Sequence, residues 1–505
     1  MEPNINNMNN VGSHQQDVYN NNNGDGSSSS STSTSTTPIN NSGSKASSAT
    51  TEEDYILSID VGTTNIRAII FDKQLNIIAK SIENIPLIID QNRPGARLAW
   101  VLENIEEARV AAKEKNMLFG TIDTWLLWNL TGGKAHCTDY SNISTTSLYD
   151  PYEMKFNSVI QYLFNIPQHI MPKVCDTAFH YGDTLPELFG RAIPITAMAG
   201  DQQSAMFGQC CFKTGDTKVT IGTGCFVDIN TGRQARASRT GMYPLIGWKI
   251  KDDIAYLMEG KGMAAGTAVD WACQFGMFEH VAQTSGLASS VPHSQGVVFV
   301  PAFTGLAPPQ NDPTARGLLI GMTPSTKREH VVRALLEALG YRAKEIIDGL
   351  VLDNHTTISK IVADGGVCQN DFVMQFSADM VGRPIDRADQ HEMTAAGACM
   401  LAGLGHGLWK TKEELIPLRK TSRLFESRMN KDNRKKLFRR WQRAVQRSMH
   451  WASSEDVHGD NDDGFGQDSD LDTSTSQHSS TGSYNGVLNS ASTSSISSLD
   501  NENKK

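Results

Sequence analysis

An apolar strand that ends in a carboxylate and enters a glycine turn opens the structured part of the sequence. The run ILSID at 56–60 ends in Asp60, and after Val61 come Gly62, Thr63 and Thr64. Glycine lets backbone N–H groups approach a ligand, and the two hydroxyls add donors, so this turn suits phosphate binding. Asp60 is then placed to hold Mg²⁺ beside the phosphates, directly or through water. The alternative is an ordinary hairpin turn.

Two further glycine turns follow strand-like runs later in the chain. Ile221-Gly222-Thr223-Gly224 lies between the runs VTI and CFVDI, and Asp364-Gly365-Gly366 follows the run ISKIVA. The first of these turns, like the Asp60 turn, joins two strand-like runs through glycine and threonine, which indicates a duplicated nucleotide clamp. A single DGG, in contrast, is more often only a turn. Together and in this order, the three turns resemble those of the actin, heat-shock ATPase and sugar-kinase class. Neither a Walker A sequence nor a strand-GxGxxG-helix unit is present.

Asp201 is the candidate general base. It follows the apolar stretch IPITAMA at 193–199 and stands where a strand passes into a helix, within Gly200-Asp201-Gln202. A carboxylate beside a polyol hydroxyl can take its proton while the γ-phosphoryl group of ATP moves. The alternative role is structural, because aspartate at a helix start often serves only to satisfy free N–H groups.

At this point the ordered core resembles the FGGY carbohydrate kinases, specifically the glycerol kinases and most of all the glycerol kinase 5 branch. The resemblance covers nearly all of residues 54–452. It rests on stretches that occur in one order: IDVGTTNIRAIIFD, LFGTIDTWLLWNLTGG, TDYSNIS, AGDQQSAMFGQ, TIGTGCF, VPAFTGLAPPQNDPTARG, ADGGVCQNDF and TAAGACMLAGLGHGLW.

The resemblance implies ATP and Mg²⁺ as cofactors and transfer of the γ-phosphate to glycerol, giving sn-glycerol 3-phosphate. Asp201 would be the base and would contact glycerol together with Gln202, and Asp60 and Asp201 would be the metal ligands. The positions that match nucleotide contacts of the family are Asp60, Gly62, Thr63, Thr64, Asn65, Arg67, Thr223, Gly266, Gly366 and Asn370.

The resemblance breaks between about Pro86 and Ala96, where family members carry a long block that includes a strand, an Arg-Glu pair, a Trp and a Tyr. Only IIDQNRPGA joins the two sides here. Three readings remain open: a glycerol kinase represented by an incomplete or spliced chain, a nucleotide-binding pseudokinase that acts through partners, and a kinase of another polyol or sugar.

The expected fold is α/β, with two ribonuclease-H-like domains of the actin, hexokinase and Hsp70 type around a nucleotide cleft. We expect a disordered Asn/Ser/Thr-rich arm at 1–52, a truncated N-terminal domain at 53–198, a C-terminal domain at 199–452 and a disordered Ser/Asp-rich tail at 453–505. Within them, the patterns predict a three-stranded antiparallel meander at 56–82 and helices at 98–115, 328–350 and 394–408.

The composition of the chain limits the kinds of molecule that it is expected to bind. The net charge of −9 gives the chain as a whole no positive field for nucleic acid or anionic lipid, so small solutes such as glycerol and ATP are the expected partners, and a homo-oligomer is possible. Eight scattered cysteines without CxxC, and no apolar run long enough to cross a membrane, predict free thiols and a cytoplasmic location without membrane insertion.

One stretch departs from this charge balance. Residues 433–447 (NRKKLFRRWQRAVQR) combine many cations with apolar residues at helical spacing. The pattern is typical of the last helix of a domain with one solvated face, and contact with a membrane or nucleic acid is the alternative.

Overall fold

The computed structural model describes residues 54–62, 65–84, 94–262, 264–354 and 357–453. The predicted arm at 1–52 lies outside the described residues, as do Thr63, Thr64, most of the junction expected near 86–96 and nearly all of the predicted tail at 453–505.

A small antiparallel sheet begins the described chain and confirms the predicted meander. Its strands are β1 (Ile56–Val61), β2 (Asn65–Phe71) and β3 (Ile77–Asn84), in the order β1-β2-β3. Asp72 shapes the β2–β3 turn, since its carboxylate accepts hydrogen bonds from the backbone N–H groups two and four residues later, at 2.8 and 2.9 Å. Among the described strands, none pairs with the outer edge of β1.

The main sheet has seven strands in the order β12-β13-β11-β10-β16-β17-β18. β10 runs parallel to β16 and β16 parallel to β17, while the remaining neighbours are antiparallel. The strands are β10 (Asp216–Ile221), β11 (Cys225–Gly232), β12 (Tyr243–Ile250), β13 (Asp253–Gly262), β16 (Lys360–Asp364), β17 (Ile385–Ala388) and β18 (Thr421–Phe425).

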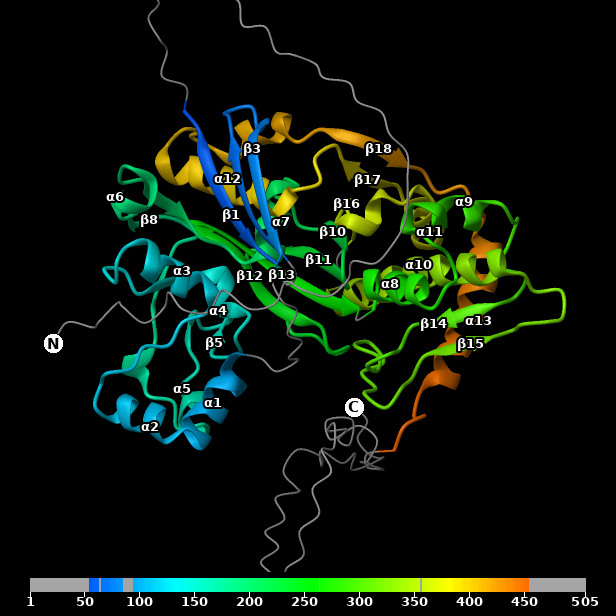
Figure 1. Cartoon of the computed structure of the whole chain (residues 1–505), viewed down its shortest axis with the longest axis horizontal. Coiled ribbons are helices and arrows are strands. Elements are labelled where there is room, and N and C mark those ends of the chain that lie inside the picture. The colour runs from blue at the N-terminus through cyan, green and yellow to red at the C-terminus, as the bar shows by residue number, and fades with distance from the viewer. Residues whose placement is uncertain (1–53, 63–64, 85–93, 263, 355–356, 454–505) are drawn as a thin grey trace, which may run out of the picture. The chain divides into compact units, whose positions relative to one another are not determined.

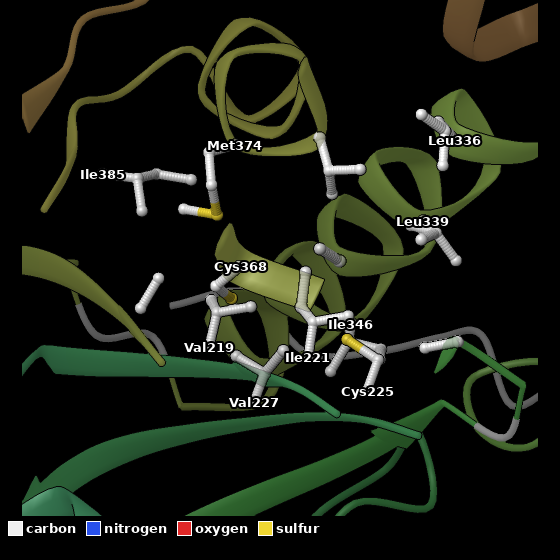
Figure 2. Close-up of a cluster of buried hydrophobic side chains, with 14 of the residues drawn as sticks. Val219, Ile221, Cys225, Val227, Leu336, Leu339, Ile346, Cys368, Met374 and Ile385 are labelled. Carbon is white, nitrogen blue, oxygen red and sulfur yellow. The ribbon is translucent and has the colours of Figure 1, made fainter. Parts of the chain in front are cut away.

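Helices cover both faces of this sheet. Alternate residues of β10 and β11 point to one face, where Val219, Ile221 and Val227 pack with α8, α10 and α11 in the largest apolar cluster (Figure 2). On the other face Met206 of α7 packs against Leu257 of β13, and α12 packs on α7. The helices are α7 (Asp201–Gly208), α8 (Gly266–Gln274), α10 (Arg328–Asn354), α11 (Asp371–Val381) and α12 (Met393–His406).

Smaller elements complete the described chain, as Figure 1 shows. The short strands are β4 (Cys137–Asp139), β5 (Tyr149–Asp150), β6 (Lys155–Phe156), β7 (Lys173–Cys175), β8 (Ala178–Asp183), β9 (Pro194–Ala197), β14 (Val298–Val300) and β15 (Leu318–Ile320). The other helices are α1 (Pro94–Asn104), α2 (Glu106–Lys113), α3 (Ile122–Leu130), α4 (Tyr140–Ser144), α5 (Ser158–Leu163), α6 (Pro186–Phe189), α9 (Thr284–Ser289) and α13 (Lys431–Ser448).

The prediction of one helix at 98–115 is wrong. The segment forms α1 and α2, which are separated at Ile105, where the backbone is extended (φ −112°, ψ 107°). Asn104 ends α1, and its side-chain amide donates to the Trp100 carbonyl at 2.9 Å. Such local side-chain bonding competes with helix continuation, and the apolar spacing does not reveal it.

All eight cysteines lie in the described residues and are free, as predicted. No described helix has the length and apolar character needed to cross a membrane.

Candidate active site

The first glycine turn joins β1 to β2. The strands pair antiparallel, with Asp60 opposite Arg67, and the Gly62 N–H closes the turn by donating to the Asn65 carbonyl at 2.9 Å. The hairpin alternative and the phosphate-binding prediction are therefore compatible, because a hairpin is what brings Asp60 and Arg67 together.

Arg67 lies between two carboxylates. Its guanidinium is 3.1 Å from Asp60 Oδ2 and 3.4 Å from an oxygen of Glu392, the residue that precedes α12. Burial raises the pKa of the Asp60 carboxyl, Arg67 lowers it, and the negative charge of Asp201 raises it again. The structure therefore brings two predicted site residues, Asp60 and Asp201, within electrostatic reach of each other.

The second turn packs against the start of α8. The Gly266 N–H donates to the Gly222 carbonyl at 2.8 Å, and the Ala265 N–H donates to the Thr223 carbonyl at 3.2 Å. A Cβ atom on Gly266 would lie 2.6 Å from the Gly222 oxygen, so only glycine fits there. Thr223 itself remains exposed, with its side chain available to a ligand.

The third turn follows β16 and lies beside the second because of strand register. Thr220 is opposite Asp364 in the parallel pair, and the Thr220 hydroxyl donates to Asp364 at 2.5 Å. Gly365 has a φ of +95°, and a Cβ atom there would lie 2.6 Å from the Ile221 oxygen. Gly366 has nothing within 4 Å of its Cβ position, so its surface is open.

Asn370 is used within the fold. It caps α11, since its Oδ1 accepts from the Phe372 and Val373 N–H groups at 3.1 and 3.3 Å. Its amide nitrogen donates to the Thr284 hydroxyl at 3.0 Å. The predicted nucleotide residue thus positions α11 and α9 relative to the third turn.

Asp201 is the first residue of α7. Gly200 occupies the cap position, and the exposed Asp201 carboxylate accepts from the Gln202 N–H at 2.7 Å. Asp201 therefore satisfies one free N–H group at the helix start, as its alternative structural role predicts. Its other carboxylate oxygen has no described protein partner and is open to a ligand.

A buried aspartate that sequence reasoning missed fixes the start of α7. Asp139 is inaccessible to solvent and accepts hydrogen bonds from the backbone and side chains of Ser141 and Asn142 and from Thr177, at 2.8–2.9 Å. The Ser141 hydroxyl in turn accepts from the Gly200 N–H at 2.8 Å. Burial raises the pKa of Asp139 to about 6, and these donors oppose the rise. The signal lay in TDYSNIS, where Asp precedes Ser and Asn at capping distance.

Gln202 is held from behind by a buried lysine, which sequence reasoning also missed. The Lys218 ammonium lies 2.6 Å from Gln202 Oε1, 2.6 Å from the Thr220 hydroxyl and 3.0 Å from Asp228 Oδ2. Lys218 and Asp228 are both completely buried. Burial lowers the pKa of Lys218, but the carboxylates of Asp228, Asp364 and Asp201 outweigh it and raise this pKa, so the ammonium is charged.

The lysine also fixes the orientation of the Gln202 amide. An ammonium group only donates, so the atom of Gln202 that faces Lys218 must be the acceptor Oε1. The amide nitrogen is then the end of the Gln202 side chain that can donate a hydrogen bond to a ligand. The same argument directs the chain of bonds onward, because the Thr220 hydroxyl accepts from Lys218 and must give its own proton to Asp364.

Close packing of α7 on α12 sets the position of Asp201 from the other side. A Cβ atom on Gly397 would lie 1.8 Å from the Ser204 oxygen, and one on Gly208 would lie 2.4 Å from the Met393 oxygen. Both glycines therefore permit the approach of the two helices. The Ser204 hydroxyl adds a hydrogen bond to the Thr394 carbonyl at 2.7 Å.

Asp60 and Asp201 could bind one divalent cation if phosphate oxygens of a bound ligand and water complete its coordination shell. Among the described residues no group of three or more His, Cys, Asp or Glu side chains is gathered for a metal ion. Asp60 and Asp201 do approach each other, and a cation would relieve their mutual repulsion. This arrangement fits Mg²⁺, which commonly takes one or two carboxylates and completes its shell with phosphate oxygens and water.

Comparisons with known proteins agree with this geometry. Residues 83–208 match the N-terminal domain, and residues 217–406 the C-terminal domain, of the FGGY family of carbohydrate kinases. The chain is 46% identical to glycerol kinase 5 of Danio rerio over 361 residues, which is 70% of this chain and 68% of that protein. It is 43% identical to glycerol kinase 2 of Thermotoga maritima over 370 residues, covering 73% and 75% of the two chains.

Solved structures show the same fold. The crystal structure of Plasmodium falciparum glycerol kinase with ADP superposes with a TM-score of 0.72 at 27% identity, covering 78% of this chain and 98% of that one. A ligand-bound xylulose kinase from Lactobacillus acidophilus, at 17% identity and covering 77% and 97%, superposes with a TM-score of 0.65. The predicted α/β sugar-kinase fold is confirmed. The chain belongs to the FGGY family of carbohydrate kinases, a family of phosphotransferases.

Proposed function

We propose that the chain is an ATP-dependent glycerol kinase, which transfers the γ-phosphate of ATP to glycerol and yields sn-glycerol 3-phosphate. The observation that carries the proposal is the geometry at the start of α7. The Asp201 carboxylate is exposed there, and the neighbouring Gln202 is held by Lys218 at 2.6 Å. The negative charge of Asp201 also raises the pKa of Asp60 in the first glycine turn. The glycerol kinases among the relatives support glycerol as the acceptor.

In this mechanism Asp201 accepts the proton of the attacking hydroxyl group. Its carboxylate is exposed, and one of its oxygens is free of described partners, while the Gln202 amide nitrogen would donate to a hydroxyl oxygen of glycerol and orient it. Arg67 and the backbone N–H groups of the glycine turns would bind the phosphates. Mg²⁺ held by Asp60 and Asp201 would neutralise the charge that develops on the phosphoryl oxygens.

The domain assignment belongs to the same proposal. We assign residues 53–198 and 199–452 to the two ribonuclease-H-like domains between which ATP binds, and the two family matches support a division of this kind. The free thiols support the proposed cytoplasmic location.

A second candidate function is nucleotide binding without turnover. The first sheet has only three described strands, and it leaves Ile59, Ile78 and Ile82 at 38%, 53% and 49% exposure. The sequence of the short junction near 86–96 contains no counterpart of the family's Arg-Glu pair, Trp and Tyr. Without these residues the identity of the polyol substrate also stays open.

The test measures binding and transfer separately on the full chain. Calorimetry with ATP and Mg²⁺ gives the affinity for nucleotide, and phosphorus NMR follows phosphate transfer to glycerol and to a panel of other polyols. Transfer to glycerol that is lost in Asp201→Asn supports the kinase. ATP binding without transfer to any acceptor supports the second candidate, and transfer to another polyol alone would replace glycerol as the substrate.

A further inference from the structure

The surface of α13 carries a line of cations. Eight of its 18 residues are Lys or Arg, against a single acid, Asp432. Two of the cations, Arg434 and Arg440, turn toward the protein, where Arg434 donates to the Met429 carbonyl and the charge of Arg440 acts on Glu337. The other six are exposed and form what we call the cationic stripe: Lys431, Lys435, Lys436, Arg439, Arg443 and Arg447.

Ion pairs do not neutralise the cationic stripe in the described part of the chain. None of its six side chains forms an ion pair with a described carboxylate. Five of the six follow one another at a spacing of four residues, which places like charges next to each other on the helix, an arrangement that destabilises it. The apolar side of α13 is already satisfied, since Trp441, Ala444 and Val445 are buried in a core cluster. Among the described residues, the six exposed cations have no anionic partner.

The chain itself contains a segment with matching charge. Residues 455–472 carry eight acids and no Lys or Arg: Glu455, Asp456, Asp460, Asp462, Asp463, Asp468, Asp470 and Asp472. This acidic segment begins seven residues after Ser448, the last residue of α13. It lies outside the described residues.

Chain length allows the acidic segment to reach the whole stripe. An 18-residue helix is about 27 Å long, and 18 extended residues span up to about 60 Å. The described chain runs on to Ser453, with the His450 and Ala452 N–H groups bonded to Asp312 and Thr314. The segment can turn back after that point and follow α13 to Lys431. Because the segment is tethered next to the stripe, its effective concentration there is in the millimolar range. A free anion of similar affinity would need a higher concentration to displace it.

We propose that the acidic segment, residues 455–472, docks on the cationic stripe of α13 in the same chain. The opposite charge, eight acids against the six cations of the stripe, and the short tether favour this occupant over others. A membrane or nucleic acid would also have to displace an anionic segment that is tethered next to the stripe. With the segment docked, the stripe is closed to other polyanions.

Zero-length carbodiimide coupling of the full chain, followed by peptide mapping, tests the proposal. The reagent joins a lysine amine to a carboxylate that touches it. We expect links between Lys431, Lys435 or Lys436 and the acidic segment. The yield of these links should not change when the protein is diluted, because both groups belong to the same chain. The links should disappear at about 1 M NaCl, where the screening length falls to about 3 Å. Absence of these links, or their loss on dilution as for a second copy of the chain, would overturn the proposal.

A matched pair of variants leaves every reactive lysine of the stripe in place. Arg439→Gln with Arg443→Gln and Arg447→Gln should lower the yield of these links several-fold. Arg328→Gln with Lys410→Gln and Lys420→Gln removes the same charge from exposed positions outside α13 and should leave the yield unchanged. Equal yields in the two variants would refute a role for the stripe. If the wild-type chain instead co-sediments with phosphatidylserine vesicles and only the α13 variant fails to, a lipid surface is the occupant and the proposal is wrong.

Discussion

Replacing Lys218 by methionine tests how Gln202 is held. Methionine has a similar length and fits a buried site, but it removes the ammonium that contacts Gln202, Thr220 and Asp228. Asp228 is completely buried and would keep no opposite charge within contact. Breaking a buried ion pair from one side costs about 3–5 kcal/mol, a large part of the stability of a typical domain.

A second substitution separates stability from activity. Asp228→Asn in the Lys218→Met background removes the uncompensated charge at nearly constant volume, so the free energy of unfolding should largely recover. The hold on Gln202 does not recover, because nothing in the double variant donates a charged hydrogen bond to its Oε1 atom. Such a bond is worth about 1.5–3 kcal/mol, which corresponds to a loss of roughly 10- to 150-fold in kcat/KM.

The assay combines urea unfolding with the kinetics of ATP-dependent phosphorylation of glycerol. We expect the single variant to lose both stability and activity, and the double variant to regain stability alone. If the double variant recovered both, Lys218 would serve only the fold and would have no part in orienting Gln202.

Four further predictions address other parts of the site. Asp201→Asn should lower kcat by about 10²- to 10⁴-fold while ATP affinity, measured by calorimetry, stays nearly unchanged; unchanged turnover would remove Asp201 as the base. Thr63→Val with Thr64→Val should weaken ATP binding by about 0.5–1.5 kcal/mol for each hydroxyl lost, and equal affinity would make that turn purely structural. Gly397→Ala should cost about 1–3 kcal/mol of unfolding free energy, since its Cβ would meet Ser204, whereas Gly286→Ala in α9 has free space and should cost nothing; similar losses would contradict the packing argument. Burial raises the pKa of Asp139 in the folded protein to about 6, against an ordinary value of 3.8, so the folded protein holds this proton more tightly. Its contribution to stability is therefore complete below pH 3.8 and is lost as the pH rises through 6. Going from pH 7 to pH 5 should stabilise the wild type by about 1.3 kcal/mol relative to Asp139→Asn, and parallel pH profiles of the two would show that Asp139 does not titrate there.

Sequence patterns were sufficient where chemistry depends on neighbours in the chain. The strand-turn-strand runs around Gly62 and Gly222 predicted hairpins, and the structure contains both. Strand register then places the Asp364 turn beside the Gly222 turn, which the order of motifs alone could indicate only through the family resemblance.

The residues that sequence reasoning missed act across long separations. Asp139 reaches Gly200 through Ser141, and Lys218 reaches Gln202 from a strand of the main sheet. A lysine in the middle of a strand reads as a solvent-facing position, and only the tertiary structure reveals that it is buried between three acceptors. The break at Ile105 was missed for a related reason, since apolar periodicity continues through a residue whose backbone leaves the helix.

The most direct test of the central claim is phosphate transfer from ATP to glycerol by the full chain and by its Asp201→Asn variant, with ATP binding measured on the same samples. The account predicts that both proteins bind ATP with Mg²⁺ and that only the wild type forms sn-glycerol 3-phosphate. Failure of the folded wild-type chain to bind ATP, or equal transfer by the two proteins, would contradict it.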